Sequence, residues 1–194
     1  DYLTKEIAAE MTRRLENRWV IDKVRNLTTE EIVQKLDSLG MSVSKEQFLR
    51  EIEGAWEFDD VVGRWTERIG VPQDPMDEDF LLVAAWALWE RWCPERPVLA
   101  MLHEWMLDGY VRQEKEQFRE ACDLWIKTWQ GFKRYFTPPM RSLREVDKDF
   151  QYYGSFEDWI QDFIGELLYL AKNDRSYAVA GVAVLSEIIG QFPD

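Results

Sequence analysis

The sequence predicts an all-α protein of about nine helices that pack as a stack of antiparallel pairs. Three observations predict this class. Apolar residues recur three and four positions apart along most of the chain. Two helix starts have the Ser/Thr-x-x-Glu/Gln spacing of a capping box. No convincing alternating apolar run or Asn-Gly hairpin turn is present. With ten Trp and ten Phe, the chain also has large apolar side chains to fill a core.

The first region, residues 1–70, predicts a series of short helices. Thr28 with Glu31, and Ser44 with a Gln three positions on, are capping boxes that satisfy free backbone N–H groups at a helix start. Gly40 follows the first of these helices and ends it. The predicted helices are residues 3–17 with a short continuation to residue 26, then 28–39, 44–53 and 57–69.

The second region, residues 76–194, follows a linker at residues 71–75 that holds two prolines. Asp77 and Asp79 stand at the start of its first helix, where carboxylates complement the helix dipole. With Asp74 they are acidic enough to suggest calcium, but they lack the EF-hand Gly and distal Glu, so helix capping is the better account. The predicted helices are residues 77–92, 97–113, 116–136, 141–151, 156–171 and 176–191.

The stretch 80–136 matches part of a tetratricopeptide (TPR) motif. When Gly109 is placed at the glycine of this motif, Trp105 falls on its early Trp, Ala121 on its small second-helix residue and Trp125 on its large apolar one. A Gly or Ala lets two antiparallel helices approach closely, so this spacing predicts a TPR-like α-solenoid stack. Four residues replace the usual Leu, Tyr, Ala and Pro of the motif: Asp108, Arg112, Thr128 and Lys133. An ordinary αα-hairpin is therefore the alternative.

The stretches 80–136 and 159–194 resemble the helical part of bacterial proteins that carry a SEC-C motif, a small zinc-binding tail. The second stretch begins Trp159-Ile-Gln-Asp-Phe-Ile-Gly-Glu-Leu and runs through Leu185-Ser-Glu-Ile-Ile-Gly-Gln-Phe-Pro-Asp. The Cys-x-Cys and Cys-His or Cys-Cys pairs of the zinc tail are absent. The resemblance implies a helical-repeat scaffold without catalytic activity, forming the N-terminal part of a longer bacterial protein.

Residues 27–53 resemble a SAP-type helix–loop–helix, a small DNA-binding module. The matching frame is Leu27-Thr-Thr-Glu-Glu-Ile-Val-Gln-Lys-Leu, Leu39-Gly-Met and Ser44-Lys-Glu-Gln-Phe-Leu-Arg-Glu-Ile. The resemblance implies nucleic-acid binding. The charge fits poorly, because Lys35, Lys45 and Arg50 stand among six acids and phosphate binding needs clustered bases.

A cluster of basic residues runs against the overall charge. The chain has 37 acids, 24 bases and a net charge of −13, which argues against a general polyanion binder. The candidate partner-binding residues, which we call the basic cluster, are Lys133, Arg134, Arg141, Arg144 and Lys148. The last three, at spacings of three and four, are expected along one helix face. They would pair with the chain's own acidic helices or attract an acidic partner.

No catalytic, cofactor or metal site is predicted. His103 stands alone, Cys93 and Cys122 form no CxxC pair, and no P-loop, GxGxxG or GxSxG occurs. A Cys–His nucleophile pair is formally possible, but nothing indicates a depressed thiol pKa. The spacing of Trp86, Trp89 and Trp92 drifts around a helix, which favours core packing over a ligand cage.

The sequence therefore predicts a non-enzymatic interaction scaffold with a protein or peptide partner. Nucleic-acid binding by residues 27–53, or by the basic segment 127–148, is the alternative. Two isolated cysteines in apolar surroundings are typical of a cytoplasmic protein with free thiols. No apolar run reaches the ~18 residues of a membrane span, so no membrane association is expected.

Overall fold

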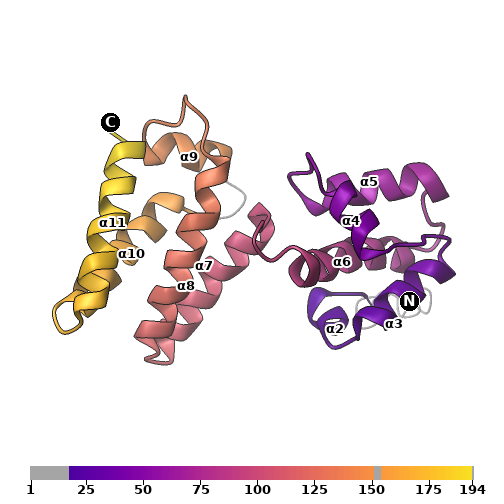
Figure 1. Cartoon of the computed structure of the whole chain (residues 1–194), viewed down its shortest axis with the longest axis horizontal. Coiled ribbons are helices and arrows are strands. Elements are labelled where there is room, and N and C mark those ends of the chain that lie inside the picture. The colour runs from indigo at the N-terminus through magenta and orange to yellow at the C-terminus, as the bar shows by residue number, and fades with distance from the viewer. Residues whose placement is uncertain (1–17, 151–153, 194) are drawn as a thin grey trace, which may run out of the picture. The chain divides into compact units, whose positions relative to one another are not determined.

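The computed structural model describes residues 18–150 and 154–193, which form ten α-helices, one short 3-10 helix and no strand. The predicted all-α class is confirmed, with ten α-helices in the described residues where the sequence predicted about nine in all. The helix predicted at residues 3–17 lies outside the described residues. The helices group into two compact units that divide between Pro97 and Val98 (Figure 1).

The first unit is built around α6. Its helices are α2 (Ile21–Arg25), α3 (Thr29–Ser38), α4 (Lys45–Glu51), α5 (Phe58–Ile69) and α6 (Pro75–Trp92). Helix α6 contacts α2, α3 and α5, and it buries residues on most of its circumference, as a helix enclosed by others does. The sequence placed this helix in the second region, after the linker at 71–75, whereas its contacts place it in the first unit.

The second proline of the predicted linker, Pro75, is the first residue of α6. Asp74 is the N-cap, and its carboxylate accepts a hydrogen bond from the Met76 backbone N–H at 2.9 Å. Pro75 occupies the first helical position, where the missing N–H has no cost. The proline therefore begins a helix that packs into the same unit.

The predicted capping box at Thr28 and Glu31 is present at the start of α3, whereas α4 begins with a cap by Ser44 alone, because the Gln47 side chain donates to Glu51. The Glu31 backbone N–H donates to the Thr28 hydroxyl at 3.1 Å, and the Thr28 N–H donates to the Glu31 carboxylate at 2.6 Å. Ser44 caps α4 by accepting from the Gln47 N–H at 3.2 Å. Gly40 follows α3 with φ +85°, a left-handed conformation that favours glycine.

The tryptophans of α6 pack inside the first unit. Trp89 is fully buried, and its ring meets Phe48 and Phe58 edge-on at centroid distances of 6.2 and 5.8 Å. Trp86 stacks on Phe58 at 4.8 Å, and Trp92 meets Phe48 at 5.4 Å. The three rings therefore contribute to the core, as the drifting spacing indicated.

The second unit contains two helix pairs. Its helices are α7 (Leu99–Glu114), α8 (Phe118–Phe132), the 3-10 helix η1 (Lys133–Tyr135), α9 (Leu143–Asp149), α10 (Phe156–Ala171) and α11 (Arg175–Gln191). Helices α7 and α8 form one hairpin and α10 and α11 the other, with α10 also against α8 and α9 (Figure 1). The predicted hairpin at 97–113 and 116–136 is present as α7 and α8.

The crossing of α7 and α8 depends on one glycine. A Cβ atom at Gly109 would lie 1.9 Å from Nε1 of Trp125, so only glycine fits beneath this ring. The Trp125 N–H donates to the Met106 carbonyl oxygen at 3.0 Å. Ala121 and Trp125 are fully buried, as the repeat spacing predicted. Trp105 is only half-buried: it packs against the core, and the Lys127 amino group lies 3.8 Å from the centroid of its ring.

Candidate functional site

The first residue of the basic cluster binds an acid of its own chain. Lys133 begins η1, and its amino group lies 3.0 Å from the Glu187 carboxylate on α11. The same carboxylate accepts a hydrogen bond from the Trp129 indole N–H at 2.7 Å. The Trp129 hydrogen bond, followed by Lys133, lowers the pKa of Glu187 below its ordinary value. Lys133 therefore joins α8 to α11.

Arg134 packs against the protein. It is half-buried, and its guanidinium carbon lies 5.2 Å from the centroid of the neighbouring Tyr135 ring. A guanidinium held over an aromatic face gains cation–π attraction. Lys133 and Arg134 therefore both have structural contacts within the second unit.

The other three residues of the basic cluster lie at α9. Ser142 is the N-cap of this helix, so Arg141 precedes it and does not share the helix face that its spacing predicted. The Arg141 backbone N–H donates to the Glu145 carboxylate at 2.6 Å. Arg144 and Lys148 do lie on α9, one turn apart, and both are exposed.

Among the residues that the structure describes, Arg144 has one ion pair, and it is long. Its Nε lies 3.9 Å from the Glu157 carboxylate, and its side chain is 85% exposed. An exposed ion pair at this distance contributes about 0–1 kcal/mol and can open at little cost. Arg144 is therefore able to exchange Glu157 for another carboxylate.

A groove in the second unit lies beside Arg144. Its volume is about 640 Å³, and we call it the C-terminal groove. Its lining residues come from the start of α9, from α10 and from the end of α11: Ser142, Leu143, Arg144, Glu157, Ile188, Ile189 and Phe192. It therefore combines four apolar side chains with a base, an acid and a hydroxyl.

The groove was not predicted from the sequence. Ile188, Ile189 and Phe192 fit the apolar pattern of a last helix, and nothing local places them beside Arg144. The hydroxyl of Ser142 takes part in the α9 capping box with Glu145. Ser142 therefore helps to begin α9 at the edge of the groove.

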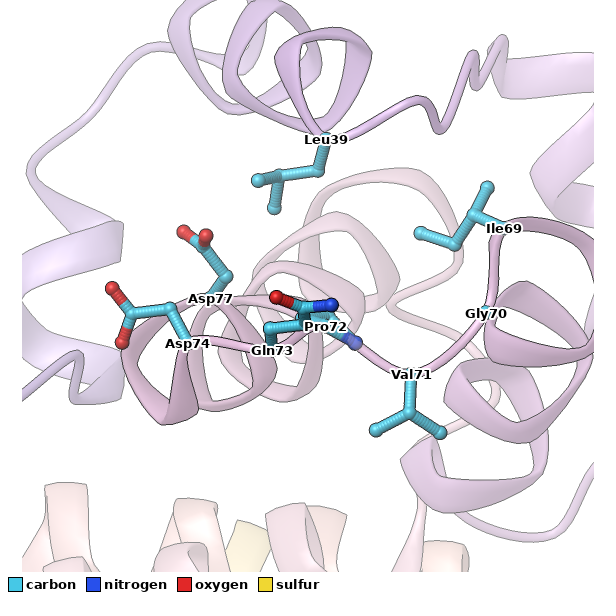
Figure 2. Close-up of a pocket in the computed structure, with 8 residues that line it drawn as sticks. All are labelled: Leu39, Ile69, Gly70, Val71, Pro72, Gln73, Asp74 and Asp77. Carbon is cyan, nitrogen blue, oxygen red and sulfur yellow. The ribbon is translucent and has the colours of Figure 1, made fainter.

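A smaller pocket of about 310 Å³ lies in the first unit, between α3, the end of α5 and the start of α6. Figure 2 shows Asp74 and Asp77 close together at one side, with Leu39 and Ile69 on other sides. Asp74 caps α6, and the Asp77 carboxylate lies 3.3 Å from the Lys35 amino group. Both carboxylates therefore have structural partners. The part of the chain that the structure describes contains no His/Cys/Asp/Glu cluster able to hold a metal ion.

The SAP-like segment does not gather its bases into one exposed patch. Lys35 is half-buried, pairs with Asp77 and lies 4.9 Å from the centroid of the Phe80 ring. Lys45 and Arg50 are exposed on α4, but Glu46 is exposed beside them. This arrangement offers little positive surface for phosphate contacts.

Both cysteine thiols are buried. Burial, with smaller contributions from Glu166 and Asp123, raises the pKa of Cys122 to about 12. Burial also lowers the pKa of His103 below its ordinary value. A thiol with a raised pKa is protonated at neutral pH, so Cys122 is poorly suited to act as a nucleophile.

We expect Cys122 to resist alkylation in the folded protein at pH 8. The raised pKa keeps the thiolate fraction very small, and burial excludes the reagent. In a Cys93→Ser variant, mass spectrometry after iodoacetamide treatment should show labelling only once urea unfolds the chain. Labelling of the native variant at the rate of a free thiol would contradict this assignment.

No family model, curated protein or solved structure matches this sequence. The resemblances to TPR, SEC-C and SAP proteins therefore stay predictions. No helix in residues 18–150 and 154–193 is long and apolar enough to cross a membrane.

Proposed function

We propose that this protein is a non-enzymatic helical scaffold that binds a protein or peptide partner at the C-terminal groove. One observation carries the proposal. The exposed bases Arg144 and Lys148 lie on the helix that borders a groove with apolar lining, in a chain with a net charge of −13. A mixed apolar and basic surface is typical of peptide recognition.

The chemistry of the groove defines the partner segment. Leu143, Ile188 and Phe192 offer contacts for one or two apolar side chains. Arg144 would leave its long contact with Glu157 and bind a carboxylate of the partner, and Lys148, one turn further along α9, would attract a second. The partner segment therefore combines apolar anchors with acidic residues.

Selection from a random peptide display library on the immobilised full chain tests this proposal. We expect enrichment of peptides in which apolar residues stand next to Asp or Glu or alternate with them. Arg144→Glu should weaken the selected peptides about tenfold, because it places two carboxylates together. The matched control is Lys172→Glu, which makes the same charge change at an exposed residue of the same unit outside the groove. An absence of any enriched peptide, or equal binding by both variants, would overturn the proposal.

Nucleic-acid binding is the alternative function. A binding titration with DNA and RNA distinguishes it from peptide binding. The proposed scaffold should not bind a DNA or RNA duplex at low salt, because net negative charge repels phosphates. Binding that falls steeply with added salt would favour the alternative. Lys45→Glu and Arg50→Glu should then weaken it if the SAP-like segment is responsible.

A further inference from the structure

The outer face of α11 carries an unusual apolar stripe. Val179, Val182 and Ile189 are 65%, 68% and 67% exposed, far more than core residues of this type. Ala183 and Ser186 are exposed between them. The positions 179, 182, 186 and 189 follow spacings of three, four and three, which is the spacing of a coiled-coil seam. We call these five residues the α11 stripe.

The α11 stripe is free of charge in a chain that is rich in charge. Helix α11 has only two charged residues, Arg175 in its first position and Glu187. Glu187 turns toward α8, where it accepts from Trp129 and pairs with Lys133. Charged residues make up 31% of the sequence, and a solvated helix face normally holds many of them. The α11 stripe therefore differs from an ordinary solvent-exposed helix face.

We propose that the α11 stripe is a self-association surface, on which α11 of a second copy packs in the antiparallel direction. Each copy has a net charge of −13, so most faces would bring acids against acids. The stripe lets two copies meet without this repulsion. A symmetric pair also matches each stripe with an identical 3-4-3 pattern, and the small residues Ala183 and Ser186 allow close approach.

Charge selects the antiparallel direction. Arg175 stands at the first position of α11. In an antiparallel pair it meets the carboxyl end of the second α11, where the helix dipole is negative and attracts a cation. A parallel pair would place the two Arg175 side chains together. Matching stripe to stripe sets the two-fold axis near Val184, midway between Val179 and Ile189, and places Val182 opposite Ser186 of the second copy.

Cysteine cross-linking tests the direction as well as the contact. When a Val182→Cys chain is mixed with a Ser186→Cys chain, mild oxidation should join them by an intermolecular disulfide, because the antiparallel pair places these two residues opposite each other. Val179→Cys should cross-link poorly with itself, since the antiparallel arrangement separates its two copies. The two native cysteines are buried, so oxidation of the unmodified chain measures the background level of cross-linking. Strong cross-linking of Val179→Cys with itself, without a disulfide between the mixed chains, indicates a parallel pair and would overturn the antiparallel assignment.

Sedimentation equilibrium measures the association itself. We expect dimers that become more abundant as salt is raised, because salt screens the repulsion between acidic copies. Val182→Asp should weaken association at least tenfold. Leu107→Asp, at a residue of α7 that is 51% exposed and outside the stripe, should leave it unchanged. Ile189 also lines the C-terminal groove, so these variants avoid it. A chain that stays monomeric at millimolar concentration, or dimers that survive Val182→Asp, would overturn the proposal.

Discussion

Replacing Trp125 with Ala is expected to lower the free energy of unfolding by about 3–5 kcal/mol. Trp125 is fully buried, and its ring contacts Tyr110 and Phe163 at centroid distances of 5.0 and 6.3 Å. Its N–H also satisfies the Met106 carbonyl oxygen. The substitution leaves a cavity at the centre of the α7–α8 crossing. Urea unfolding followed by far-ultraviolet circular dichroism measures the loss.

A truncation on the solvent side of α7 is the control for this prediction. Leu107 is 51% exposed, so Leu107→Ala should change the free energy of unfolding by no more than about 0.5 kcal/mol. If Trp125→Ala cost no more than this control, the packing at the α7–α8 crossing would be different from that described above.

Gly109→Ala is expected to cost about 1–3 kcal/mol, although Ala is normally the better helix former. The added Cβ would lie 1.9 Å from Nε1 of Trp125, so the ring or the helix must move. The loss should shrink in a Gly109→Ala, Trp125→Phe double variant, because the smaller ring vacates part of this space. Thermal unfolding of Gly109→Ala, Trp125→Phe and the double variant measures the coupling.

Gly165→Ala is the matched control, with the opposite sign. Gly165 also lies inside a helix of the second unit, but nothing stands within 4 Å of the Cβ that Ala would add. This change should therefore stabilise the protein by roughly 0.5–1 kcal/mol. Equal effects of the two Gly→Ala changes would contradict the close approach of α7 to α8.

The sequence predicted the features that depend on local chemistry. The caps at Thr28 and Ser44 depend on residues three positions apart, and they begin α3 and α4 as expected. The hairpin of α7 and α8 followed from Gly109 and Trp125, because a glycine beneath a large ring leaves a clear spacing in the sequence. Each of these interactions either joins residues that are close in the sequence or involves a distinctive pair of residue types.

The sequence could not predict features that depend on distant contacts. Pro75 reads equally well as part of a linker or as the first residue of a helix, and only the contacts of α6 assign that helix to the first unit. Arg141 has helical spacing with Arg144, but the cap at Ser142 leaves it outside α9. The C-terminal groove needs α9 and the end of α11 to meet, and no local pattern encodes that meeting.

The central claim is that Arg144 at the C-terminal groove binds a carboxylate of a partner segment. A charge exchange tests it most directly, with a selected peptide and isothermal titration calorimetry. Arg144→Glu should weaken the acidic peptide about tenfold, or roughly 1.4 kcal/mol, and a peptide with Lys in place of its acidic residue should recover most of this loss on the variant. If both peptides bind the unmodified protein and the Arg144→Glu variant with the same affinity, Arg144 does not contact the partner and the assignment of the groove is wrong.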